Sequence, residues 1–514
     1  MKRLQTPLLS VLLVGLLVGA LVARTPAHVP SRSTAAHRKS APRVIRDGAA
    51  GTYTFQNFSP PEQKDTTIEP SIAVNPANPK NAVTCYQVGR VDGGGDQDNG
   101  CATTFDGGKT WLNQNLPGLT PDSGSGQFDR ASDAVVAFGP KNVVYANDLV
   151  FDDTSDNGLR SAIVTNVSKD GGKTWGPPVT TIDDQGGGLN DKNWIIVDNS
   201  KAAGHHYGRV YVVWDRVVPV LASYSDDEGA TWSQPSVIFS GQGIGTMPVI
   251  QPNGDLTVIF DTSTEPAPPV SQPESEGQNV GSDNIVAATA VGAGMVPTGS
   301  PLAFSPPVTI ESYLGNSVRL QRAGTLPTAA IDDKTGRIYV SWEDGRWRKN
   351  TPNASPENDI AVSWSDDGGV TWTPATKVNP GKGGGRKDHY NPMLAVGPDG
   401  SVRIGYLERK EGASEGDFSP FVNTYFQQST NHGKTWSTPL HVNRNKSDVR
   451  FAAFSRGGAF FGDYNQMAAA GSWTYITRCV AYSPFSGAPA MFPPKIHHQQ
   501  TWVAIVDSDG NGKP

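Results

Sequence analysis

The stretch Ser365-Asp366-Asp367-Gly368-Gly369-Val370-Thr371-Trp372 occurs in five versions along this chain of 514 residues. In every version a hydroxyl residue comes first, Asp or Asn stands two residues later, Gly four residues later and Trp seven residues later. The other versions span residues 104–111, 168–175, 225–232 and 429–436, and the last has Asn431 in place of Asp.

The chemistry of this octapeptide is that of a folded turn. A short Asp or Asn side chain accepts hydrogen bonds from backbone N–H groups a few residues later, and Gly adopts positive φ without steric cost. The closing Trp has a large apolar body that can fix the turn to a neighbouring sheet. We therefore expect five rigid β-hairpin corners. The alternative is that these Asp residues are catalytic, but repetition favours a structural role.

The composition agrees with a turn-rich all-β protein. The chain has 57 Gly, 40 Pro and 12 Trp, and only 18% of its residues are charged. Its length does not require several domains, because repeat architectures grow by adding units. The formal net charge of -6 gives no reason to expect a nucleic acid as partner.

The N-terminus has the pattern of a secretory signal peptide. Lys2 and Arg3 precede an uncharged apolar run at 8–23, and small residues follow at 25–27. We expect residues 1–27 to be removed and the protein to be secreted, extracellular or periplasmic, without a membrane attachment afterwards. A retained signal anchor is the alternative, since the apolar run approaches spanning length.

The other boundaries follow from composition. The basic, Ala-, Ser- and Pro-rich segment 28–50 is expected to be a disordered tether, residues 51–507 a folded domain and residues 508–514 a polar tail. Cys85 and Cys101 lie on strands that we expect to be adjacent, so they form either a disulfide or two free thiols, and Cys479 stays single.

A unit of four expected strands repeats every 55 to 80 residues or so. Its first strand is small and apolar, its second is β-branched and aromatic, and its third runs into the octapeptide turn. Seven segments have the character of the first strand: 71–74, 134–137, 194–197, 247–250, 328–331, 393–396 and 467–470. The sequence therefore predicts an all-β fold, a β-propeller of four-stranded blades, with seven blades favoured and six as the alternative. We expect residues 52–55 to close the ring as an N-terminal strand of the last blade.

The repeated turn resembles the Asp-box, or BNR repeat, of the sialidase superfamily. The segment Glu69-Pro70-Ser71-Ile72-Ala73-Val74-Asn75-Pro76, together with Gly462-Asp463-Tyr464-Asn465, resembles secreted bacterial sialidase-like proteins. The resemblance implies six blades, three arginines that hold a substrate carboxylate, an Asp as acid and base, and a Tyr with a Glu partner as nucleophile. Glu69-Pro70-Ser71-Ile72 stands where the family has Phe-Arg-Ile-Pro, so a relative acting on another glycan is equally expected.

Strand alternation separates the two rims of the propeller. The octapeptide turns share one rim with the turns between first and second strands, so the starts of the first strands and the ends of the second strands line the other rim. We expect catalytic groups there at Tyr464, Asp463, Glu343 and Asp129, and substrate-binding groups at Arg130, Arg216, Arg346, Arg409, Asp191 and His389. By the resemblance, Tyr464 stands at the nucleophile position, Arg346 and Arg409 in the carboxylate clamp, and Arg130 or Arg216 completes it. The alternative is that these ion pairs only fix loops.

The sequence thus favours a metal-independent glycoside hydrolase, without cofactor and monomeric, that acts on terminal acidic sugars of glycans. The alternatives are a non-catalytic propeller that binds glycan or protein, and a polysaccharide lyase. The acidic, Pro-rich insertion at 262–284 is either a lid or a disordered insertion. The tail from Asp507 resembles the start of a calcium loop but ends before a closing Glu.

Overall fold

The computed structural model describes residues 41–52, 63–91, 93–152, 160–185, 188–216, 218–262, 282–315, 318, 321–323, 326–348, 357–381, 386–411, 418–455, 458–512 and 514. They belong to one compact unit, residues 40–514. The expected signal peptide, the first part of the tether and residues 263–281 of the insertion lie outside the described residues. Within the described residues the only helical segments are the short 3-10 turns η1 (Pro121–Ser123), η2 (Pro140–Asn142), η3 (Ala293–Met295) and η4 (Val449–Phe451). None of the described helices has the length and apolarity needed to cross a membrane.

Four sheets consist of antiparallel strands that follow one another along the chain. The first is β10 (Asp191–Val197), β11 (Val210–Asp215), β12 (Val220–Ser225) and β13 (Ser236–Phe239). The second is β14 (Ile244–Ile250), β15 (Leu256–Thr262), β16 (Ser282–Ala290) and β17 (Val308–Leu314). The third is β19 (Thr328–Ile331), β20 (Ile338–Asp344), β21 (Asp359–Ser365) and β22 (Thr376–Lys377). The fourth is β23 (Lys387–Val396), β24 (Val402–Glu411), β25 (Phe418–Ser429) and β26 (Leu440–His441), with β27 (Ser447–Asp448) beside β25.

A fifth sheet has twelve strands and contains three antiparallel groups of four. One group is β2 (Gln63–Val74), β3 (Ala82–Arg90), β4 (Asp96–Thr104) and β5 (Leu112–Asn115). Another is β6 (Arg130–Phe138), β7 (Val144–Phe151), β8 (Ser161–Ser168) and β9 (Val179–Asp183). The third is β30 (Gln466–Ala470), β31 (Trp473–Ala481), β32 (Gln499–Asp507) and β1 (Arg43–Gly51). Single residue pairs, Asp96 with Ala131 and Thr66 with Gln499, join the groups.

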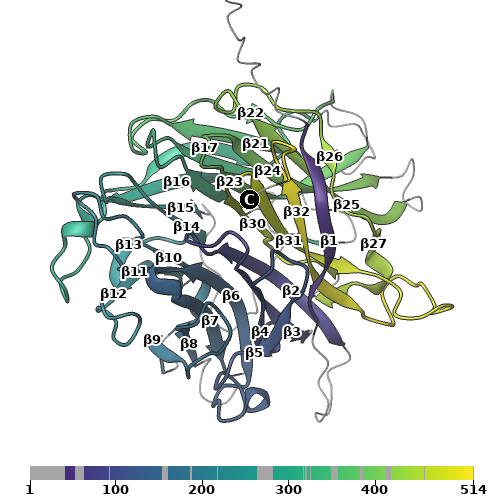
Figure 1. The fold of residues 1–514 in the computed structure, drawn as a ribbon, viewed down its shortest axis with the longest axis horizontal. Coiled ribbons are helices and arrows are strands. Elements are labelled where there is room, and N and C mark those ends of the chain that lie inside the picture. The colour runs from purple at the N-terminus through teal and green to yellow at the C-terminus, as the bar shows by residue number, and fades with distance from the viewer. Residues whose placement is uncertain are drawn as a thin grey trace, which may run out of the picture. The chain divides into compact units, whose positions relative to one another are not determined.

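The fold is an all-β propeller arrangement of four-stranded blades. By hydrogen bonding, the described strands form five sheets of four or more strands, and not the seven, or six, separate blades that we expected. The physical reason is that the two single-pair bridges fuse three four-stranded groups into one sheet. All seven expected first-strand segments do lie in strands, and these strands contact one another in the order β2, β6, β10, β14, β19, β23, β30 and again β2. Figure 1 shows the labelled strands of this set around a common centre.

The N-terminal segment corrects one expectation. Residues 43–50, assigned to a disordered tether, belong to β1, which pairs with β32 and closes that group. The closing strand therefore lies before the expected residues 52–55, of which 53–55 lie outside the described residues. Arg478 binds Asp47 at 2.6 Å with both side chains buried, and Arg46 donates to the Gly107 carbonyl at 2.7 Å. These contacts explain why a basic segment is ordered here.

The octapeptide turns have the expected structure in all five copies. In the copy at 365–372, the Ser365 hydroxyl accepts from the Gly369 N–H at 2.8 Å, and Asp367 accepts from the Thr371 N–H at 2.8 Å and from its hydroxyl at 2.6 Å. Asn431 accepts from the Thr435 N–H at 2.9 Å in the same way. The turns also meet the turns between first and second strands, as when Gly107 N donates to Lys80 O. The Asp residues therefore serve their own turns.

The described residues settle the pairing of the cysteines and show how the tail and the ends of the insertion lie. Cys85 on β3 and Cys101 on β4 face each other in register and form a disulfide, and Cys479 is free and buried. The tail at 508–512 folds back as a turn, since Asp507 accepts from the N–H groups of Gly510 and Gly512 at 3.1 and 2.7 Å. The ends of the insertion are strand residues, because Thr262 closes β15 and Asn284 lies in β16.

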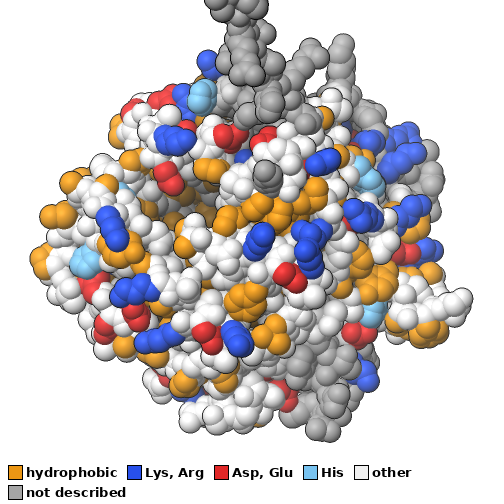
Figure 2. Space-filling view, in the orientation of Figure 1, with side chains coloured by type: hydrophobic (Ala, Val, Ile, Leu, Met, Phe, Trp, Pro, Cys, Tyr) orange, Lys and Arg blue, Asp and Glu red, His pale blue; other side chains and the backbone are white. Residues whose placement is uncertain are grey.

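Charged side chains of both signs are scattered over the face seen in Figure 2, interspersed with apolar ones. The described side chains on this face therefore do not gather into a patch of one sign.

Candidate active site

A bulge recurs near the start of the first strands and shapes the centre of the molecule. Five first strands break register with their second strand at this point, and each break contains a residue with positive φ. These residues are Glu69 (φ 51°), Asp133 (φ 48°), Lys192 (φ 23°), Gly245 (φ 75°) and Asn391 (φ 52°). Non-glycine residues rarely adopt this conformation, and where they do the strain often belongs to a functional site. The repeat of the bulge brings side chains of different chemistry to equivalent positions.

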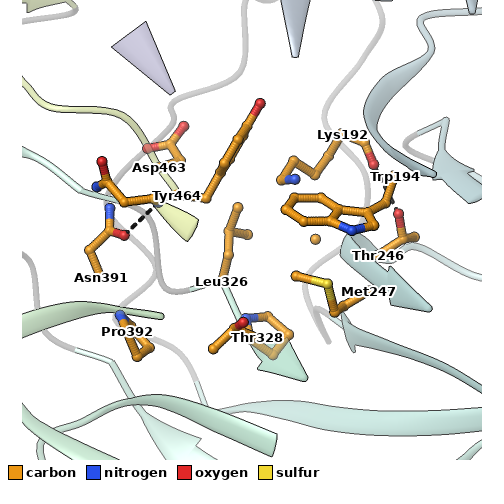
Figure 3. Close-up of a pocket in the computed structure, with 13 residues that line it drawn as sticks. Lys192, Trp194, Thr246, Met247, Leu326, Thr328, Asn391, Pro392, Asp463 and Tyr464 are labelled. Atoms are coloured by element: carbon orange, nitrogen blue, oxygen red, sulfur yellow. Dashed lines mark hydrogen bonds between the residues drawn. The ribbon is translucent and has the colours of Figure 1, made fainter. Parts of the chain in front are cut away.

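Tyr464 stands at the centre of this set, before the start of β30. Its ring meets that of Trp194 edge-on at 5.7 Å between centroids. The Lys192 amine lies 3.8 Å from the centroid of the Tyr464 ring and 4.1 Å from that of Trp194. Figure 3 shows Tyr464 between Asp463 and the pair Lys192 and Trp194. Burial, followed by the negative charges of Asp133 and Glu69, holds the pKa of Tyr464 well above its usual range.

The space beside these side chains is an axial pocket. Lys192, Trp194, Leu326, Asn391, Asp463 and Tyr464 are among its lining residues. Its cavity volume is about 10 Å³, which is room for about one water molecule. Asp463 and Leu326 are partly open to solvent, and 20% of the Asp463 side chain is exposed.

Two buried carboxyls near Tyr464 differ in their affinity for a proton. Burial and the nearby charges of Asp133 and Asp463 raise the pKa of Glu69 to about 8. Burial and the charge of Asp191 raise the pKa of Asp133 only to about 6, because the Lys192 cation opposes them. Both carboxyls therefore bind a proton more tightly than a carboxyl in water does, and Glu69 binds it more tightly than Asp133. Such a separated pair can divide the roles of acid and base.

Asp463 connects this group to Arg322 and, through Ser455, to Arg90. A small sheet positions both arginines, and its strands are β18 (Gln321–Arg322), β28 (Ala453–Ser455) and β29 (Gly458–Phe460). Arg322 donates to Asp463 at 2.8 Å, and the Asp463 backbone N–H donates to Glu69 at 2.8 Å. Arg322 and Arg90 both donate to the Ser455 hydroxyl, at 3.1 and 2.9 Å, and both lie over the Phe460 ring. We call Glu69, Asp133, Lys192, Arg322, Asp463 and Tyr464 the axial cluster.

The network around Asn391 holds the axial cluster in place. Glu343 accepts from the Asn391 backbone N–H at 3.0 Å. The Asn391 side chain donates to the Gly462 carbonyl at 2.9 Å and accepts from the Asn465 N–H at 2.9 Å. The chain on both sides of Asp463 and Tyr464 is thereby fixed to the neighbouring sheet. Glu343 thus supports the site through the backbone of Asn391.

The structure brings some of the expected site residues together and not others. Tyr464 and Asp463 belong to the axial cluster, and Asp191 acts on Asp133 from beside it. Arg409 is buried beside Tyr390. Arg130 starts β6, opposite Phe151. Asp129 lies beside Asp152, which pairs with Arg160.

Three expected substrate-binding residues lie in other networks. Arg216 binds Asp184 at 2.8 Å. Arg346 binds Asp344 at 2.6 Å and Glu311 at 3.3 Å. His389 contacts Glu408 at 3.1 Å and helps line a second pocket. The interpretation of Arg216 and Arg346 as residues that fix loops describes these contacts better than a role in a carboxylate clamp.

Four members of the axial cluster were not among the expected site residues. Asp133 and Lys192 lie at the starts of first strands, where the sequence signal already pointed, but the choice of one residue there depends on the bulge. Glu69 belongs to the quoted Glu-Pro-Ser-Ile segment, but we expected no role for it in the site. Arg322 lies in a two-residue strand between longer blades, so the sequence pattern carried no signal for it.

No family model matches the chain, and no curated protein matches it in sequence. Solved structures with a similar fold include a protein of unknown function from Dyadobacter fermentans. Its alignment with this chain has TM-score 0.48 and 11% sequence identity, and it covers 91% of this chain and 99% of that chain. A polysaccharide lyase of family PL25, an ulvan lyase, has TM-score 0.46 and 11% identity over 89% of this chain and 95% of its own. The intramolecular trans-sialidase from Ruminococcus gnavus has TM-score 0.40 and 13% identity over 71% of this chain and 92% of its own. At these scores the likeness does not identify an activity.

Proposed function

We propose that the axial cluster is the active site of a glycoside hydrolase that removes terminal acidic sugars from glycans. The observation that supports this most is the position of Tyr464 beside two carboxyls with different proton affinities, Glu69 and Asp133. A phenol, a protonated carboxylic acid and an ionised carboxylate at one place are the groups that a Tyr-dependent retaining hydrolysis needs.

The roles follow from the protonation states. Glu69 gives its proton to the glycosidic oxygen as the bond from that oxygen to the anomeric carbon breaks. The Tyr464 oxygen forms a bond to the anomeric carbon, and its proton passes to Asp133. Water then attacks the anomeric carbon, breaks its bond to Tyr464 and releases the sugar, while the protons return.

The charges of the cluster support an acidic sugar. Lys192 lies over the Tyr464 ring, Arg322 binds Asp463, the neighbour of Tyr464 in the chain, and a guanidinium matches the two oxygens of a carboxylate. We place the sugar at the mouth of the axial pocket, next to the exposed edge of Asp463, because the cavity itself is only about the size of one water.

The test is turnover of a panel of fluorogenic sialosides, glucuronides and galacturonides. Tyr464→Phe should abolish release of the fluorophore, whereas Tyr475→Phe is the matched control. Tyr475 is also buried, but its hydroxyl donates to Pro79 O in the turn between β2 and β3. The proposal fails if the wild type releases no sugar from any member of the panel, or if both variants keep full activity.

A glycan-binding propeller without turnover is the second candidate. Glu69, Asp133, Lys192 and Tyr464 are each no more than 6% exposed, which leaves little room for a reacting bond inside the pocket. Retention on immobilised acidic glycans without any product would select this candidate. A product that absorbs in the ultraviolet because it is unsaturated would select a lyase.

We also propose export and a count of seven repeats. The disulfide between Cys85 and Cys101 supports an oxidising compartment, as expected after removal of residues 1–27. Mass analysis of the mature N-terminus tests the cleavage.

The circle of contacting first strands supports seven repeats, three of which share one hydrogen-bonded sheet. An experimental map that showed fewer first strands around the axis would contradict this count.

A further inference from the structure

A second pocket lies on the sheet that begins with β23, beside the segment that joins β22 to β23. Its lining residues are Pro380, Lys387, His389, Tyr406, Glu408, Tyr425 and Pro439, and we call it the His389 pocket. It shares no lining residue with the axial pocket. Its cavity volume is about 120 Å³, well below that of sites for drug-sized ligands. The space therefore suits a group the size of one ring.

One end of the His389 pocket presents hydrogen-bonding groups. Lys387 binds both oxygens of Glu408, at 3.0 and 3.1 Å, and its side chain is 47% exposed. His389 Nε2 lies 3.1 Å from the second of these oxygens. Lys387 and Glu408 thus place a donor and an acceptor side by side, with their charges balanced.

Buried groups behind His389 fix the orientation of its ring. Asp359 receives hydrogen bonds from Arg348 at 2.5 Å, from Asn379 at 2.8 Å and from Lys377 at 2.8 Å. The His389 Nδ1 atom faces this group, 3.1 Å from the Asn379 amide and 3.5 Å from Asp359. The other ring nitrogen is thereby directed at Glu408. A pocket floor held this firmly is pre-organised for a ligand.

The side of the pocket is aromatic. Tyr406 and Tyr425 are stacked with 6.0 Å between ring centroids and 23° between ring planes, and His441 lies 5.3 Å from Tyr425. Tyr406 is buried, whereas Tyr425 is half-buried and Pro439 stands beside it. Tyr425 thus lies between Tyr406 and His441, and its exposed edge stands near paired donors and acceptors, which matches a molecule with apolar C–H groups and a polar edge.

We propose that the His389 pocket binds a neutral sugar ring of a glycan, as a site separate from the axial cluster. The C–H groups of the ring pack against Tyr425 and Pro439, and two neighbouring hydroxyls bind Lys387 and Glu408. The paired charges of Lys387 and Glu408 make a neutral polyol a better occupant than an anion or an organic cation, each of which would break that pair. The site goes beyond the proposed function, because it needs no bond to be cleaved.

The experiment is isothermal titration of the full protein with neutral hexasaccharides of glucose, galactose, mannose and xylose. We expect the wild type to bind at least one of them. Tyr425→Ala should weaken this binding about tenfold or more, since it removes an aromatic wall of the pocket. Lys387→Ala, a change at an exposed position, should also weaken it, while Tyr425→Phe, which keeps the ring, should bind far more tightly than Tyr425→Ala.

Tyr464→Phe and Lys434→Ala are the controls, and both should bind as the wild type does. Hydrolysis of small fluorogenic substrates by Tyr425→Ala should equal that of the wild type, so failure of the axial proposal and of this one are distinguishable. The inference is wrong if no hexasaccharide binds, if binding is lost in Tyr464→Phe but kept in Tyr425→Ala, or if Lys387→Ala and Tyr425→Ala both bind normally.

Discussion

The octapeptide turns and the axial cluster contain the same side chain in opposite circumstances. Asp367 lies in the outer turn, where hydrogen bonds from the Thr371 hydroxyl and backbone hold its pKa below the usual range. Asp133 is buried at the axis, where loss of water raises its pKa to about 6. A carboxylate whose hydrogen bonds are satisfied within its own turn stays ionised and structural, whereas a buried one near other carboxyls can exchange a proton. The Asp that repeats in the sequence is the structural carboxylate of the turn.

The largest expected effect is on turnover. Asp133→Asn should lower kcat/KM for an acidic glycoside by about a hundredfold to ten-thousandfold, because the proton of Tyr464 loses its acceptor. Asp367→Asn should leave kcat/KM unchanged, since Asn431 already fills the equivalent place in another turn. Steady-state kinetics of the two variants compare the regions directly, and equal losses in both would break the distinction.

The second effect is on the pH dependence of stability. Burial raises the pKa of Asp148 to about 8. Its ordinary value of 3.8 applies to the unfolded chain. The unfolded state therefore loses the proton first as pH rises, so Asp148 lowers the free energy of unfolding between about pH 4 and pH 8. Asp148→Asn should remove this loss. We expect the variant to gain stability relative to the wild type at pH 8 and to gain little at pH 4, as measured by urea unfolding at both values.

A smaller effect belongs to the turn. Asp367→Ala removes the acceptor for the Thr371 N–H and hydroxyl, and should cost about 1 kcal/mol of unfolding free energy. Asp367→Asn should cost less, because the amide oxygen still accepts. Urea unfolding of both variants at pH 7 distinguishes them. Equal losses in the two variants would mean that the charge, which both variants remove, and not the hydrogen bonds, stabilises the turn.

Much of the fold could be predicted because its signals are local. The octapeptides, the seven first-strand segments and the pairing of Cys85 with Cys101 depend on nearby residues and on alternation. Tyr464 and Asp463 followed from the same reasoning. Local charge pairs gave a misleading prediction of substrate-binding residues. Arg346 stands two residues after Asp344 and binds it, so these two charges pair with each other at the end of the strand.

The remainder of the site depends on contacts between distant segments. Glu69 receives the backbone N–H of Asp463, and Arg322 reaches Asp463 from a separate short strand. The bulge that directs Asp133 and Lys192 to the axis is a backbone conformation with positive φ, and the residue types Asp and Lys do not predict it. Strand β1 was missed because its basic residues find partners, such as Asp507 for Arg43, far along the chain.

The pH dependence of kcat/KM tests the central claim most directly. If Asp133 must be ionised and Glu69 protonated, the profile for an acidic glycoside should be bell-shaped, with limbs near about 6 and about 8 that belong to the pair. Asp133→Asn should abolish the acidic limb together with most of the rate. A flat profile from pH 5 to pH 9, or an acidic limb that survives in Asp133→Asn, would contradict the account.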